Sequence, residues 1–93
     1  MKSYTKSEIA VKLNSLNGWR HEDNFIVKTF VFKDFSEAFG FMGRVALISE
    51  VIAHHPDWSG VNNKITIKLN THEAGGITEN DFDFAERVEQ LFR

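Results

Sequence analysis

The 93 residues suffice for one domain with one hydrophobic core, and 42% of them are hydrophobic and 26% charged, as is ordinary for a globular protein. The net charge of −2 provides no basic surface for nucleic acid or anionic membranes. The lack of cysteine excludes disulfides and thiolate chemistry, and no apolar run has the length of a signal peptide or membrane span. We therefore expect a single cytoplasmic domain over residues 1–93.

The first third of the chain predicts a helix and then a β-hairpin. Thr5-x-x-Glu8 has the pattern of a capping box, and apolar residues with helical spacing follow it as far as Gly18, where the helix should end. Residues 19–21 and 25–33 are typical of strands, and the polar residues between them of a turn.

A long second helix is predicted from Asp34 or Ser36, either of which can cap its start, to about His54. The i, i+3, i+4 spacing predicts an inward face made of Phe35, Ala38, Phe39, Met42, Val45, Ala46, Ser49, Ile52 and Ala53. A second apolar set lies off that face: Phe41, Leu47, Ile48 and Val51. Two interpretations stay open: this chain buries the helix on all sides, or the outer surface of the helix contacts another subunit.

The C-terminal half predicts a second hairpin and a last helix. Residues 57–61 and 64–71 are typical of strands, and two asparagines between them can form the tight turn. After a glycine turn, Thr78-x-x-Asp81 opens a helix whose inward residues are Phe82, Ala85, Val88 and Phe92. The order αββαββα with short links predicts an α+β fold, a four-stranded antiparallel sheet with helices covering one face.

Two adjacent histidines, His54 and His55, lie where the second helix must stop, because Pro56 disfavours helical backbone angles at the preceding residue. Histidine gains or loses a proton near neutral pH, and the negative end of a helix dipole favours its charged form. Glu50 stands one helical turn before His54, where its carboxylate can orient that ring. The segment therefore suits acid/base catalysis.

A third histidine ends the alternating strand, in Asn70-Thr71-His72-Glu73, and Trp58 offers a flat apolar surface just after the histidine pair. Plainer interpretations remain open for each of these features. A histidine at a helix end can be only a cap, an exposed one only a solvated side chain, and a tryptophan only part of the core or its rim.

Three histidines and a glutamate also resemble a set of metal ligands. Neighbouring histidines at a helix end rarely aim at one ion, however, and no His-x-x-x-His pair occurs on a helix. A metal site is therefore disfavoured. His21, in the first hairpin, lies outside the cluster, and we interpret it as a surface residue.

Several short segments carry a resemblance to one family. In chain order they are Lys33-Asp34-Phe35, Ala38-Phe39-Gly40-Phe41-Met42, Arg44-Val45-Ala46-Leu47, Glu50, His54-His55-Pro56 with Trp58, Asn63-Lys64, and Thr71-His72-Glu73. In order and spacing, over about residues 18–90, they resemble the pterin-4a-carbinolamine dehydratases. A His-His-Pro motif with a downstream Thr-His-Glu is specific to that family.

The resemblance implies a dehydratase, a carbon–oxygen lyase that converts 4a-hydroxytetrahydropterin to quinonoid dihydropterin and water. Such enzymes recycle the pterin cofactor of aromatic amino acid hydroxylases. The resemblance also implies the αββαββα fold and a reaction without metal or organic cofactor. The implied catalytic histidines are His54, His55 and His72, and the expected substrate contacts are Ala53, His54, His55, Trp58, Asn70, Thr71, His72 and Glu73.

Within that implied reaction, we expect His54 and His72 to transfer protons on the two sides of the 4a carbon, and His55 to polarise the departing oxygen. Glu50 would orient His54. Which histidine is acid and which is base stays open. Asp81 is expected to be a helix-cap carboxylate that could also stabilise a nearby histidine.

The chain departs from the family pattern at two positions. Asn62 stands where the family commonly has an aromatic residue, which affects a packing contact behind the site. Ala53 stands where the family often has a polar residue, which affects a polar contact to the pterin.

The alternative function is a non-catalytic protein-interaction module, such as a transcription coactivator or assembly factor, that uses the off-face apolar residues of the second helix. A complete set of three histidines favours the enzyme. The expected partners are a pterin and further copies of this chain, in a homodimer or homotetramer formed through the second helix or a sheet edge. We expect no direct contact with nucleic acid and none with membranes.

Overall fold

The computed structural model describes all 93 residues, and its main elements follow the predicted order αββαββα. A short 3₁₀ helix, η1, is the one addition. The elements are α1 (Lys6–Leu13), β1 (Arg20–Glu22), β2 (Phe25–Val31), α2 (Phe35–Ile52), β3 (Asp57–Val61), β4 (Lys64–Leu69), η1 (His72–Ala74) and α3 (Glu79–Phe92). The predicted α+β class is confirmed.

The four strands form one antiparallel sheet in the order β1-β2-β4-β3. Each hairpin closes with a two-residue turn in which asparagine or aspartate adopts the positive φ that such turns require: 50° at Asp23, 62° at Asn24 and 59° at Asn62. Pairing β2 with β4 in the middle brings the two hairpins together. The chain thereby places the end of β4, next to the predicted third histidine, beside the turn of the first hairpin.

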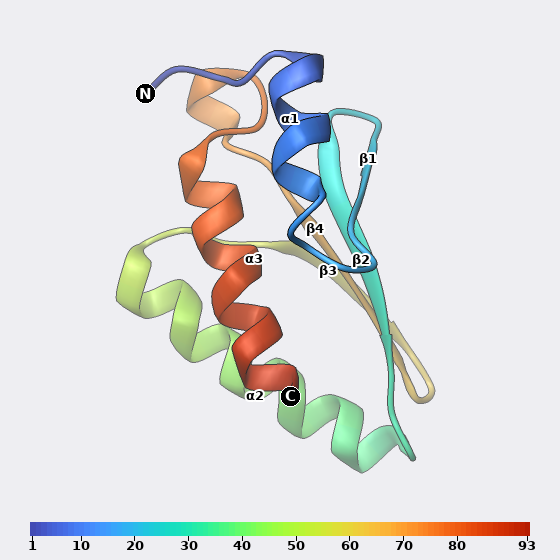
Figure 1. The fold of residues 1–93 in the computed structure, drawn as a ribbon. Coiled ribbons are helices and arrows are strands. Elements are labelled where there is room, and N and C mark those ends of the chain that lie inside the picture. Colours follow the sequence, from blue (N-terminus) through green and yellow to red (C-terminus); the bar gives the residue numbers. More distant parts are fainter.

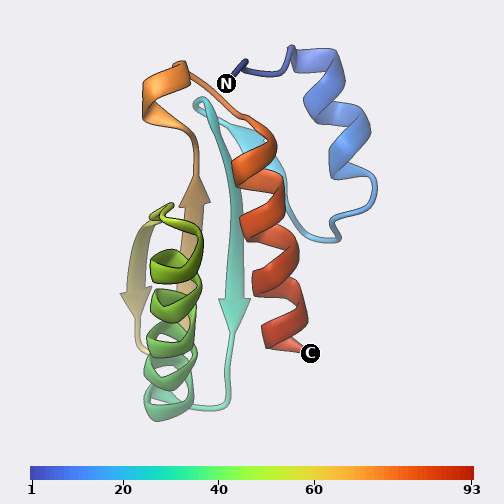
Figure 2. The same cartoon turned by 90° about the vertical axis from the view of Figure 1, so that its left-hand side faces the viewer.

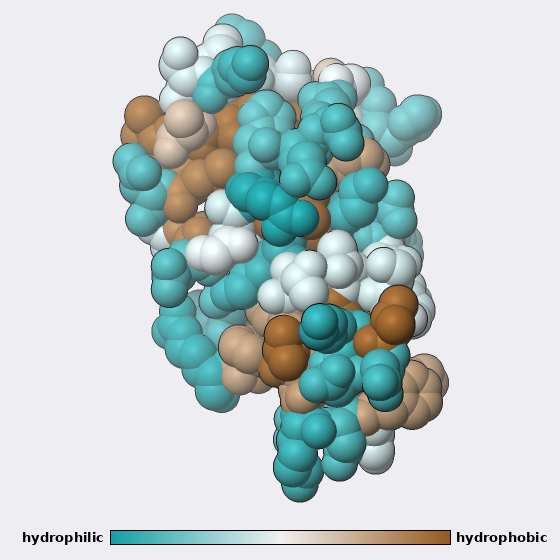
Figure 3. All heavy atoms as spheres, turned by 90° about the vertical axis from the view of Figure 1, so that its right-hand side faces the viewer, coloured by the Kyte–Doolittle hydropathy of each residue, from teal (hydrophilic) through white to brown (hydrophobic).

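The three helices lie on one face of the sheet, with α3 between α2 and α1 (Figures 1 and 2). The core lies between these two layers and includes alternate residues of the strands, such as Ile65, Ile67 and Leu69 of β4. The opposite face carries no helix and is turned to the viewer in Figure 3, where hydrophilic residues predominate. This division between a covered face and a polar face is typical of antiparallel sheets.

Several predicted boundaries are wrong by a few residues. The first helix ends at Leu13 rather than near Gly18, and a run of turns then lets Leu16 and Trp19 enter the core. Strand β4 ends at Leu69, so the third histidine belongs to η1 and not to a strand. After Leu69 the chain forms a turn and no longer pairs with a neighbouring strand, and Thr71 makes only an isolated bridge to Gly76.

The predicted inward face of α2 is partly wrong. Phe41, assigned off that face, is 1% exposed, whereas Phe35 and Phe39, assigned to it, are 59% and 63% exposed. Ala46 is exposed as well. Phe41 points inward because its ring packs against both the sheet and α3, at ring-centroid distances of 5.1 Å from Phe30 and 5.9 Å from Phe92.

Within this single chain, α2 is therefore not buried on all sides. Its outward surface exposes Leu47 and Val51 in addition to the two phenylalanines. None of the helices combines the length and the apolar character needed to cross a membrane.

Candidate active site

A cavity of about 220 Å³ lies where α2 ends and where the chain leaves β4. It is lined by Ala53, His54, His55, Asn70, His72 and Glu73. The fold thus brings the three predicted histidines together from two segments that are distant in the sequence, while His21 remains in β1, outside this cavity. Pockets for drug-sized ligands measure about 300–1,000 Å³, so this one suits a smaller molecule.

Because of the way α2 ends, the side chains of the two adjacent histidines point in different directions. Ala53 adopts the left-handed conformation (φ 54°, ψ 44°), and the backbone N–H of His54 donates to the carbonyl of Ser49 at 3.2 Å. After this reversal the side chain of His54 is only 11% exposed and that of His55 is 70% exposed. One imidazole is therefore held in the protein, and the other lies at the cavity mouth.

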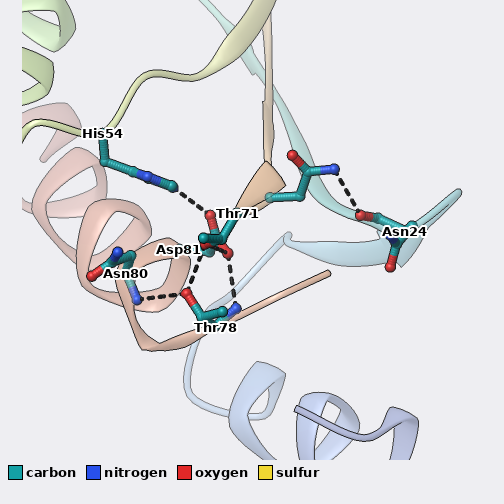
Figure 4. Close-up of polar contacts among 7 residues, drawn as sticks. Asn24, His54, Thr71, Thr78, Asn80 and Asp81 are labelled. Atoms are coloured by element: carbon teal, nitrogen blue, oxygen red, sulfur yellow. Dashed lines mark hydrogen bonds and ion pairs between the residues drawn. The ribbon is translucent and has the colours of Figure 1, made fainter. Parts of the chain in front are cut away.

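The partner of His54 is Asp81 of α3. Its Oδ1 lies 2.6 Å from Nε2 of His54, and the aspartate side chain is fully buried. Its Oδ2 accepts hydrogen bonds from the hydroxyl of Thr71 and the backbone N–H of Thr78, both at 2.9 Å. Figure 4 shows the ring of His54 directed at the Asp81 carboxylate from the side away from Thr78. Asp81 is both the predicted helix cap and the residue that holds the histidine.

The hydrogen bonds around Asp81 have one consistent direction. Asn80 donates its backbone N–H to the Thr78 hydroxyl oxygen, at 3.2 Å. The hydroxyls of Thr78 and Thr71 are 2.7 Å apart, and since Thr71 donates to Asp81, Thr78 donates to Thr71. All these partners of Asp81 are donors, which suits an ionised carboxylate. The remaining partner, Nε2 of His54, then carries the hydrogen, so in the neutral form of the ring Nδ1 is the nitrogen with the lone pair.

The predicted pairing of Glu50 with His54 is wrong. The carboxylate of Glu50 lies 3.5 Å from Nε2 of His55 instead, and both side chains are largely exposed. The prediction assumed that the helix continues through His54. The left-handed residue Ala53 breaks the i, i+4 relationship and brings the next imidazole back toward the helix.

The third histidine is held by a closed loop. Thr71 and Gly76 form an isolated antiparallel bridge, in which the N–H of Thr71 donates to Gly76 at 2.8 Å. Between them η1 exposes His72 and Glu73, and Gly75 follows with a φ of 71°. The loop therefore presents both side chains at the cavity without burying either of them.

Two other predicted site residues, Thr71 and Trp58, lie outside the cavity lining, and so does Asn62, where the chain departs from the family pattern. Thr71 is buried, and its hydroxyl is used by Asp81 and Thr78. Trp58 lies on the helix-facing side of the edge strand β3 and is 46% exposed. Asn62 does not lie behind the site, because strand β4 separates it from Asn70 by about 20 Å at 3.3 Å per residue.

Sequence reasoning assigned Asp81 chiefly to the helix cap and missed how directly it binds His54. The signal that could have shown this is the capping box itself, because it fixes a carboxylate at a helix start shortly after the His72 loop. No group of three or more histidine, aspartate or glutamate side chains has an arrangement that could hold a metal ion.

Comparison with known proteins places the chain in a family. The sequence model of the family described as pterin 4 alpha carbinolamine dehydratase matches residues 2–91. The chain therefore belongs to this family of dehydratases, as the resemblance implied.

Individual relatives agree with this assignment. A Sulfurisphaera tokodaii protein is 43% identical over 91 residues, which cover 98% of each chain. One from Prochlorococcus marinus is 52% identical over 73 residues, covering 78% of this chain and 77% of the relative. Both are provisionally named as pterin-4-alpha-carbinolamine dehydratases.

Two solved structures share the fold. A Brucella melitensis protein, described as a transcriptional coactivator/pterin dehydratase, has a TM-score of 0.94 and 38% identity, with coverage of 99% of this chain and 100% of the other. A pterin dehydratase-like protein, described as a RuBisCO assembly factor of the alpha-carboxysome, has a TM-score of 0.70 and 25% identity, with coverage of 82% and 90%.

Proposed function

We propose that the cavity binds a 4a-hydroxytetrahydropterin and that its histidines catalyse loss of the 4a-hydroxyl group as water. The observation that carries this proposal is the convergence of three imidazoles on one small cavity, one of them fixed by a buried carboxylate. Family membership supports the same reaction.

The reaction balances with proton transfers alone. The bond between C4a and the hydroxyl oxygen breaks, the oxygen receives a proton and leaves as water, and N5 loses a proton as the C4a–N5 double bond forms. No electron acceptor takes part, so the reaction requires no redox cofactor, and we propose that the histidines perform the proton transfers without a metal. A positioned acid or base contributes about 10²–10⁴-fold to each proton transfer.

The contacts of each histidine suggest its role. Nε2 of His54 is occupied by Asp81, so Nδ1 of the neutral ring is the base that removes the N5 proton. His55 and His72 are exposed at the cavity, where either can protonate or polarise the departing hydroxyl. Ala53, Asn70 and Glu73 complete the wall around the heterocycle.

Stopped-flow measurement with chemically generated 4a-hydroxytetrahydropterin tests the proposal. We expect acceleration by the wild-type protein, retained after exhaustive chelation, and loss of most of it in His54→Ala. His21→Ala is the matched control and should retain full activity, because His21 lies in β1 away from the cavity. A wild-type rate no faster than the uncatalysed one would refute the function. An activity lost with the metal would refute the cofactor-free mechanism.

In the cell, we propose that the enzyme acts in the cytoplasm to return pterin cofactor to an aromatic amino acid hydroxylase. The chemistry supports this proposal, because such a monooxygenase forms the 4a-hydroxy adduct and the product needs only reduction to serve again. Accumulation of 4a-hydroxytetrahydropterin derivatives after deletion of the gene would test it, and unchanged pterin pools would contradict it.

A second property, self-association through α2, is favoured by the exposed apolar residues of that helix. Phe35, Phe39, Leu47 and Val51 are all exposed on its outward surface. Gly40 and Gly43 have open space where a Cβ would lie, so the backbone of a second α2 could approach closely. We propose that a second copy of this chain covers this surface, because it would bring an equally apolar helix. An interaction module for another protein is the alternative.

Light scattering of Leu47→Glu tests this interface. We expect the wild type to be an oligomer at micromolar concentration and the variant to shift toward monomer, since the charge would be buried without a partner. Val11→Glu places the same charge on an exposed valine of α1 and should not alter the mass. A monomeric wild type would contradict self-association and favour a different partner.

A further inference from the structure

The turn of the first hairpin contacts the loop that carries the third histidine. The side-chain amide of Asn24 donates to the carbonyl of Gly75 at 3.1 Å, and the backbone carbonyl of Asn24 accepts from the side-chain amide of Asn70 at 3.3 Å. These bonds link residues 51 and 46 positions apart. Asn24 thus contacts the cavity loop at both of its ends, just before and just after η1.

The loop has two separate attachments. On the inner side, the hydroxyl of Thr71 donates to Asp81, the same carboxylate that holds His54. On the outer side, two hydrogen bonds that involve side-chain amides connect the loop to Asn24. In Figure 4, His54 and Asn24 lie on opposite sides of Thr71. Asn24 also lies close to Gly76, where an added Cβ would be 3.6 Å from Oδ1 of the asparagine.

The exposed residues of the loop depend on these attachments. His72 and Glu73 line the cavity but are not buried, and neither side chain is hydrogen-bonded to another residue in this structure. Their positions therefore follow the backbone of η1. A shift of that backbone would move His72 relative to His54 without disturbing the core.

We propose that Asn24 is a positioning residue for catalysis: its amide holds the η1 loop so that His72 faces the same substrate as His54. The proposal rests on the proposed dehydratase function. Asn24 does not touch the substrate and acts only through the loop.

The left-handed backbone of Asn24 (φ 62°) allows a clean test. Asn24→Gly keeps this conformation available and removes only the side-chain bond to Gly75. Asn24→Asp retains size and turn preference but replaces the donor with a carboxylate facing the carbonyl. The matched control is Asn62→Gly, at the left-handed position of the other hairpin, where the side chain makes no recorded hydrogen bond.

We expect Asn24→Gly to lower kcat about tenfold, with KM changed less than about twofold, since misplacement of a catalytic group by 1 Å can cost about 10²-fold. Asn24→Asp should be slower still. Asn62→Gly should match the wild type in kcat. The melting temperature of Asn24→Gly should fall by only about 4–8 °C relative to Asn62→Gly, as expected for one lost hydrogen bond in a domain of this size. Equal kcat in wild type and Asn24→Asp would overturn the proposal, as would equal losses in both glycine variants.

A readout without turnover separates this proposal from the dehydratase function. Hydrogen exchange at the amides of Ala74 and Gly75, which donate to Thr71 and His72, reports opening of the loop. Exchange should be about tenfold faster in Asn24→Gly than in Asn62→Gly, as expected when one hydrogen bond is lost. Equal exchange rates in Asn24→Gly and Asn62→Gly would refute the role of Asn24 in holding the η1 loop, even in an active enzyme. Faster exchange in a protein without dehydratase activity would refute only the function.

Discussion

The same sequence motif opens two helices of this protein and has different consequences in each. At α1, Thr5 and Glu8 form a capping box on the surface, and at α3, Thr78 and Asp81 form one in the interior. The backbone N–H of Thr5 holds the pKa of Glu8 below its ordinary value, and that contact is the main role of the carboxylate. Asp81 is buried, and its second oxygen binds His54.

The difference shows how a helix-capping carboxylate becomes part of the candidate active site. Both carboxylates satisfy backbone donors at a helix start, where the dipole favours negative charge. Only the buried carboxylate also makes a hydrogen bond to an ionisable side chain, that of His54. Burial strengthens that interaction because water does not compete for it. The comparison predicts that equivalent substitutions at the two boxes will differ greatly in effect.

The largest effect is expected for Asp81→Asn. With its oxygen toward Thr71 and Thr78, the amide presents its NH₂ group to Nε2 of His54, which must then accept. The neutral ring then carries its hydrogen on Nδ1, which can no longer act as a base. We expect kcat to fall by about 10²–10⁴-fold. The free energy of unfolding should fall by about 1–3 kcal/mol, because buried hydrogen bonds to a charged carboxylate become weaker, neutral ones. Stopped-flow kinetics and urea denaturation measure the two effects.

The matched variant at the other box is Glu8→Gln. Glu8 is exposed and far in sequence from every residue of the cavity, so kcat should stay within about twofold of the wild type, as for other exposed charges. Similar kinetic losses in the two variants would contradict the distinction between the boxes.

A smaller effect is expected for Thr71→Val, which removes one donor to Asp81 while keeping the side-chain volume. Asp81 retains the backbone N–H of Thr78 and its contact with His54. Urea denaturation should show a loss of about 1–3 kcal/mol, because the Thr78 hydroxyl loses its acceptor in the interior. The fall in kcat should be smaller than for Asp81→Asn. A larger fall would mean that Thr71 itself contacts the substrate.

Little change is expected for Glu50→Gln. The carboxylate lies at the surface, 3.5 Å from an exposed His55, and such pairs contribute at most about 1 kcal/mol. Steady-state measurement should give a kcat within about twofold of the wild type. A loss of more than tenfold would restore the sequence-based role of Glu50 as the residue that orients a catalytic histidine.

The smallest effect concerns acid stability at the α1 box. The pKa of Glu8 is below its ordinary value of 4.5 in the folded chain, mainly because the Thr5 backbone N–H donates to the carboxylate. As pH falls, the unfolded chain binds the proton first. The contribution of Glu8 is therefore complete above about pH 4.5 and is lost as pH falls through the lower folded pKa. Urea midpoints of wild type and Glu8→Gln should differ at pH 7, and the difference should shrink as pH falls below about 4.5. A constant difference would contradict the assignment.

Local sequence signals predicted the fold well. Capping boxes, hairpin turns and strand alternation depend on residues close in sequence, and the structure confirms the element order and the sheet. Which side of α2 faces the core could not be predicted in this way, because apolar residues lie on most sides of that helix. Whether Phe41 or Phe39 faces inward is decided by packing against the sheet and α3, through contacts outside the helix.

The site was predicted as a set of residues but not as a set of contacts. The three histidines share a cavity, as expected from their positions at a helix end and a strand end. The pairing of Glu50 with His54 failed because one left-handed residue, Ala53, ends the helical spacing. The bond from Asp81 to His54 joins residues 27 positions apart and depends on how α3 packs against the end of α2.

The central claim is that three of the four histidines surround one pterin, and the fourth provides an internal control. NMR titration with a non-reactive dihydropterin would follow the ring resonances of all four. We predict saturable shifts with one common dissociation constant for His54, His55 and His72, and no shift for His21. A titration in which His72 does not respond while His54 does would contradict the shared cavity.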